Sequence, residues 1–118
     1  MDIQSYKKQL QETVVDPMIE FMGDGEDCGF SKKDIEECEA LILKYLVALD
    51  GMKEPSNQEI MEYVKELVLA LNDLNEKTDY SMIETGEREA ICEIIQNSAV
   101  ECGLTDPGDD ITEEWREW

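Results

Sequence analysis

Residues Ser56 to Lys77 read SNQEIMEYVKELVLALNDLNEK and carry the clearest structural pattern in the chain. Ser56 suits a helix N-cap, and Glu59 stands three residues later, where a capping-box partner belongs. Apolar residues then recur at the spacing of one helical face: Ile60, Val64, Leu67, Val68, Leu71 and Leu74. The stretch predicts an amphipathic helix of about five to six turns, long enough to form one wall of a small core.

Helical periodicity also covers residues 3–22 and 31–50, on the N-terminal side of this stretch. The first segment is interrupted by Asp16-Pro17, so it is either one kinked helix or two short ones. The second begins with Ser31 and Asp34, which are placed to form another capping box.

On the C-terminal side, a fourth helix is expected from near Ser81 to Gly103, and residues 110–118 are expected to add a short helical turn. No stretch shows the two-residue alternation of a strand. The sequence therefore predicts an all-α, single-domain bundle of four main helices spanning residues 1–118, with a short C-terminal helical turn.

Charge is the unusual property of the composition. Thirty acidic residues against ten basic ones give a formal net charge of −20. Such a field repels phosphates, so we expect neither nucleic-acid binding nor attachment to anionic membranes. It attracts basic proteins, although the same charge is also compatible with a role in solubility alone.

Several features point to the cytoplasm. The first residues lack the basic start and apolar run of a signal peptide, and no window has the roughly 20 apolar residues of a membrane span. The four cysteines, at positions 28, 38, 92 and 102, lack CxxC spacing, so reduced thiols are expected.

Catalytic and metal-binding signals are weak. Histidine is absent, which excludes His-based catalysis and imidazole metal ligation. The acidic loop from Asp24 to Phe30 resembles a calcium loop only in part, because Cys28 and Ile35 fall at ligand positions. We therefore expect no enzyme activity, no metal and no cofactor.

The C-terminal half resembles a family of small, uncharacterised bacterial proteins. The resemblance rests on Leu71-Asn72-Asp73-Leu74, on an Ile-Glu-Thr-x-x-Arg-Glu segment at 83–89, and on the terminal Arg116-Glu117-Trp118. It implies a helical fold with a docked C-terminus and implies no reaction.

Two groups of residues are candidates for specific roles. Glu84 and Arg88 are four residues apart, which favours a structural ion pair on one helical face, with ligand or partner contact by Arg88 as the alternative. Acidic clusters and exposed aromatics are the candidate partner-binding residues: Asp34, Glu37, Tyr80, Asp109, Asp110, Glu113, Glu114 and Trp118.

Two hypotheses about function follow. In the first, the chain is an acidic binding protein that sequesters or inhibits a basic protein partner, most concretely an immunity protein against a nuclease-type toxin, with DNA mimicry as a variant. In the second, it is an assembly protein that forms a homodimer through apolar helix faces, including Leu43 and Val47.

Overall fold

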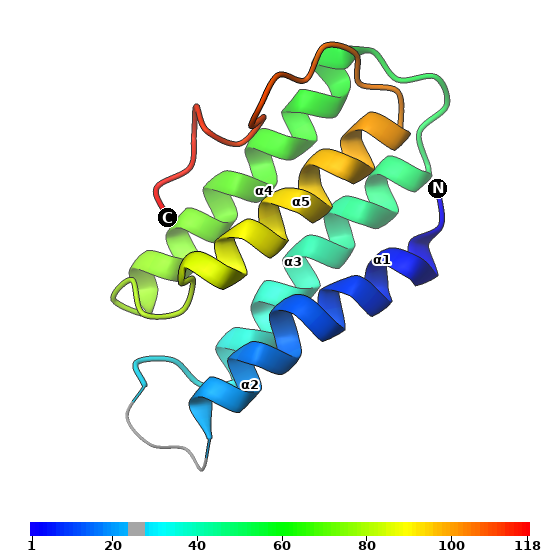
Figure 1. Cartoon of the computed structure of the whole chain (residues 1–118). Coiled ribbons are helices and arrows are strands. Elements are labelled where there is room, and N and C mark those ends of the chain that lie inside the picture. Colours follow the sequence, from blue (N-terminus) through cyan, green and yellow to red (C-terminus); the bar gives the residue numbers. More distant parts are fainter. Residues whose placement is uncertain (24–27) are drawn as a thin grey trace.

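The computed structural model describes residues 1–23 and 28–118, and every regular element in these ranges is helical. Consecutive helical segments run antiparallel and form an elongated bundle of 46 × 28 × 20 Å (Figure 1). The prediction of an all-α bundle with four main helices is confirmed. The predicted acidic loop includes residues 24–27, which lie outside the described ranges.

The first helical segment is continuous but irregular. It consists of α1 (Ile3–Leu10), a π-helical turn η1 (Gln11–Val15) and α2 (Asp16–Met22). Pro17 has no N–H to donate, and its ring would clash with the carbonyl of residue 13 in a regular α-helix. The wider turn just before the proline relieves this conflict, so the first segment is one helix with a π-bulge.

The two long helices α3 (Lys32–Asp50) and α4 (Asn57–Lys77) pack side by side. Each begins with the predicted capping box: the Ser31 hydroxyl accepts from the Asp34 N–H, and the Ser56 hydroxyl accepts from the Glu59 N–H. The predicted apolar face of α4 is buried, and it forms the wall of the core opposite the first helical segment.

The last helix, α5 (Thr85–Glu101), contacts the first segment, α3 and α4, and so closes the core. Its buried residues Ile91, Ile94 and Ile95 are fully shielded from solvent. Tyr45 of α3 reaches across the core and donates its hydroxyl to the Ile95 carbonyl at 2.9 Å, while also lying 3.0 Å from the Ser98 hydroxyl. The Tyr45 hydroxyl, which enters this core, is therefore hydrogen-bonded.

Residues 104–118, which we call the C-terminal strap, run from the end of α5 back along α4 (Figure 1). Leu104 and Ile111 of the strap are buried. The predicted short helical turn is present, because the Arg116 N–H donates to the Thr112 carbonyl at 2.9 Å.

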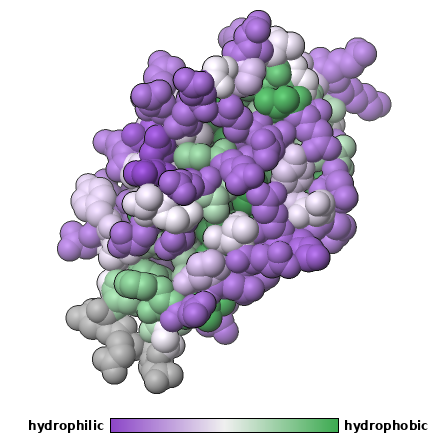
Figure 2. Space-filling model, viewed as in Figure 1, coloured by the Kyte–Doolittle hydropathy of each residue, from purple (hydrophilic) through white to green (hydrophobic). Residues whose placement is uncertain are grey.

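The view in Figure 2 shows a mostly hydrophilic face with a hydrophobic patch at the α2 end of the bundle. The exposed apolar residues of α2 are Ile19 and Phe21, and the Phe21 ring stacks on Phe30 at 6.2 Å between centroids.

Candidate partner-binding surface

The solvent-facing side of α4 carries a row of carboxylates that we call the α4 ridge: Glu62, Glu66, Asp73 and Glu76. With Leu69 they recur at intervals of four, three, four and three residues, which places them on one stripe of the helix. All four carboxylates are exposed, and none forms an ion pair with another described residue. Leu69 is 41% exposed in the middle of the stripe.

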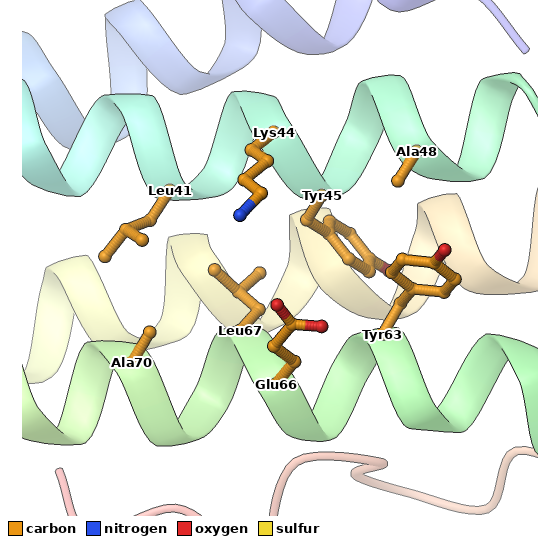
Figure 3. A pocket seen from close by; sticks show the side chains of 8 residues that line it. All are labelled: Leu41, Lys44, Tyr45, Ala48, Tyr63, Glu66, Leu67 and Ala70. Atoms are coloured by element: carbon orange, nitrogen blue, oxygen red, sulfur yellow. The ribbon is translucent and has the colours of Figure 1, made fainter.

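A groove between α3 and α4 borders the ridge on one side. It has a volume of about 70 Å³ and is lined mainly by apolar and aromatic side chains. Figure 3 shows Lys44 of α3 and Glu66 of α4 pointing toward one another from opposite walls. Within the described ranges no ion pair joins them, so the Glu66 carboxylate remains available to an external cation.

The C-terminal strap borders the ridge on the other side and is held by three side-chain amides. Each uses both its oxygen and its nitrogen. Asn57 bonds the backbone N–H and the side chain of Thr105. Gln96 bonds the Gly108 carbonyl and the Ile111 N–H.

The third amide belongs to Asn72, which is 6% exposed. It donates to the Trp115 carbonyl at 2.8 Å and accepts from the Glu117 N–H at 3.0 Å. The Trp115 ring lies half-buried with the Lys65 ammonium 5.9 Å from its centroid. The side of α4 next to the strap is thus occupied by the chain itself.

Arg116 and Asp110 form the polar centre of the strap. Their charged groups approach to 2.8 Å, and the Asp110 carboxylate also accepts from the N–H and hydroxyl of Thr112. Partial burial alone would raise the pKa of the Asp110 carboxyl, but these hydrogen bonds and the Arg116 charge hold the pKa below its usual value. Asp110 is therefore a structural carboxylate.

Two predicted partner-binding residues on α3 are also engaged within the chain. Lys77 lies 3.3 Å from Asp34 and 3.2 Å from Glu37. Partial burial alone would raise the pKa of the Asp34 carboxyl. The hydrogen bonds from Ser31 and the Lys77 charge outweigh this effect and lower the pKa. These contacts tie the start of α3 to the end of α4.

The remaining predicted residues lie in different places. Asp109, Glu113 and Glu114 are exposed along the strap, and Tyr80 is 58% exposed in the α4–α5 connection. Trp118 is half-buried, with the Arg116 guanidinium 5.6 Å from its ring centroid. The structure thus gathers the strap residues into one region, while Tyr80 lies at the end of the bundle where α4 gives way to α5.

The predicted ion pair between Glu84 and Arg88 is wrong, because no ion pair joins these two described residues. Glu84 is the N-cap of α5 and has extended backbone angles (φ −90°, ψ 179°), so it lies outside the regular helical turns that place residues four apart on one face. The two residues are linked through the backbone instead, since the Arg88 N–H donates to the Glu84 carbonyl at 2.8 Å.

The four cysteines are unpaired thiols, and Cys38 is buried in the core. Burial raises the pKa of the Cys38 thiol to about 12, which keeps it protonated at neutral pH. No group of three or more His, Cys, Asp or Glu side chains in residues 1–23 and 28–118 is arranged to hold a metal ion.

The sequence did not single out Glu62, Glu66 and Asp73 as a site. Their spacing was the available signal. No local sequence pattern indicates that the amides of Asn57, Asn72 and Gln96 hold the strap, because their partners lie more than 10 residues away in the sequence.

No described helix combines the length and apolar character required to span a membrane. No family model, curated protein or solved structure matches the chain. Its function must therefore be argued from the arrangement of its own residues.

Proposed function

We propose that this protein is a non-enzymatic binding protein that sequesters or inhibits a basic protein partner, in the manner of an immunity protein that neutralises a toxin. The observation that carries the proposal is that the carboxylates are at least partly exposed to solvent and that most of them have no ion-pair partner within the described residues. None of those in residues 1–23 and 28–118 is buried, and the ones that form ion pairs there are Glu12, Asp34, Glu37, Asp50 and Asp110.

The α4 ridge places four carboxylates without an internal ion-pair partner on one face of a long helix. Neighbouring carboxylates on one helical face repel one another, and four-residue pairs such as Glu62 and Glu66 destabilise a helix by about 0.2–0.5 kcal/mol. A cationic partner surface would relieve this repulsion. The same field would draw the partner toward the protein and raise the association rate, an effect that falls with ionic strength.

The roles assigned by the proposal differ between residues. The ridge carboxylates and the exposed strap residues Asp109, Glu113 and Glu114 would face the partner and steer it. Asp34, Glu37 and Asp110 would act indirectly, because they hold the surface in place through their internal partners. A partner inhibited in this way would present a cluster of Lys and Arg, as nucleic-acid-binding active sites do.

The proposal is tested by affinity capture from the native host lysate at low and high salt, followed by mass spectrometry and an activity assay of the captured protein. We expect a stoichiometric basic protein that elutes with salt and is inhibited by the purified chain. A triple variant of the ridge (E62Q/E66Q/D73N) should lose capture. A matched variant at exposed positions away from it (E20Q/E36Q/E54Q) should retain capture.

A second candidate is homodimerisation through α3, which the 61% exposure of Val47 favours. Two chains of net charge −20 repel each other, so such a dimer needs apolar contacts that persist in high salt. Light scattering distinguishes the two candidates. A salt-resistant dimer that Val47→Lys dissociates would support assembly, and a monomer at all concentrations would exclude it.

A further inference from the structure

The groove between α3 and α4 has the size of a side-chain pocket. Its volume of about 70 Å³ is well below the roughly 300–1,000 Å³ typical of small-molecule sites. Its floor and walls are formed by Leu41, Tyr45, Ala48, Leu67 and Ala70, and Tyr63 stands at its mouth with 39% of its surface exposed (Figure 3). The groove therefore suits one medium-sized apolar side chain.

The charges around the groove restrict what can carry that side chain. Glu66 belongs both to the groove wall and to the α4 ridge, so the opening adjoins a row of carboxylates without internal partners. Lys44 is the one cation that lines the groove. A second copy of this acidic chain would bring its own carboxylates against the ridge, whereas a basic segment would pair with it.

We propose that the α3–α4 groove is the anchor site for a basic amphipathic helix of the partner, which inserts a leucine-sized side chain between Tyr63 and Leu41 and lays Lys or Arg residues along the α4 ridge. This inference rests on the proposed function and names its recognition element. In this helix-in-groove arrangement, the inserted side chain increases affinity through apolar burial. The carboxylates of the ridge orient the helix and raise the association rate.

The test uses two synthetic helical peptides of alanine and lysine that carry equal charge. One has a central leucine and the other has alanine at that position. By fluorescence anisotropy in moderate salt, we expect the leucine peptide to bind about tenfold more tightly, which corresponds to the partial burial of one leucine. Amide shifts in two-dimensional NMR should concentrate in residues 41–48 and 63–70.

Variants of the protein separate the groove from the ridge. Ala70→Leu fills the groove from α4 and should remove the tenfold preference for leucine while leaving the lysine-driven binding. If Ala70→Leu perturbs folding, Tyr63→Ala takes its place as the test. It removes the side chain at the mouth of the groove and should also remove the preference for leucine. Ile19→Ala, at an apolar position on α2 with 40% exposure, is the matched control and should change nothing.

Equal affinity for the two peptides would overturn the groove assignment while leaving charge-driven partner binding intact. Failure of both peptides to bind at low salt would contradict the proposed function as well. Displacement of the leucine peptide by self-association of the protein, seen as a dimer in light scattering, would also overturn it, because a second copy would then be the occupant.

Discussion

At the scale of single residues, the surface depends on side chains that bond to distant parts of the chain. Asn72 satisfies two backbone groups of the strap at once, and Arg116 links Asp110, Thr112 and the Trp118 carbonyl. Asp110 looks like an ordinary surface acid in the sequence, and only its partners in the folded chain make it structural. Asp34 is marked by its capping-box spacing from Ser31, but no local pattern indicates its contact with Lys77.

Asn72→Ala removes both hydrogen bonds to the strap and leaves the Trp115 carbonyl and the Glu117 N–H without this partner. We expect a loss of about 1–3 kcal/mol in the free energy of unfolding, the usual cost of unsatisfied groups that are partly buried. Urea denaturation followed by tryptophan fluorescence measures it. Asn97→Ala, at an exposed position, should be neutral, and an equal effect of the two variants would contradict the role of Asn72.

The contribution of Asp110 to stability should depend on pH. Because the folded state lowers the pKa of this carboxyl, its stabilising contribution is complete above the unfolded value of about 3.9 and is lost as the pH falls through the folded value. Asp110→Asn should therefore cost about 1–2 kcal/mol at neutral pH.

The difference in unfolding free energy between wild type and Asp110→Asn should shrink below about pH 4. Chemical denaturation at several pH values measures this difference. A difference that stays constant from neutral to acidic pH would show that the carboxylate charge is not what stabilises the strap.

At the scale of elements, the sequence predicted what periodicity and capping can specify. The apolar face of α4 and both capping boxes are where the pattern placed them. The sequence did not decide between one kinked helix and two short helices, because Asp16-Pro17 is compatible with both. Packing of the segment against α3 and α5 favours the continuous helix with a π-bulge. The groove was not predictable, since it depends on how α3 and α4 are spaced where Ala48 and Ala70 line it.

The α4 ridge should not contribute to stability. Because its carboxylates are exposed and repel one another, the E62Q/E66Q/D73N variant is expected to unfold at the same or slightly higher urea concentration, with a gain of a few tenths of a kcal/mol. Asp34→Asn should instead lose about 1 kcal/mol through its capping and ion-pair contacts. A marked loss of stability in the ridge variant would assign these carboxylates to folding.

At the scale of the whole molecule, the net charge of −20 is distributed over a bundle whose core is apolar and whose buried Tyr45 hydroxyl and Asn75 amide are hydrogen-bonded within the chain. The charge is a surface property and not a requirement of the fold. The composition could indicate a basic partner. It could not indicate a face, because only the folded chain shows which carboxylates already have partners.

The most direct test of this account is the association rate of the captured basic partner, measured by stopped-flow fluorescence at increasing salt for wild type, the ridge variant and the matched E20Q/E36Q/E54Q variant. We predict that wild type and the matched variant associate rapidly with a steep fall in rate as salt increases. The ridge variant should associate about tenfold more slowly and depend less on salt. Equal rates and equal salt dependence for the ridge and matched variants would contradict the claim that the α4 ridge is the docking surface.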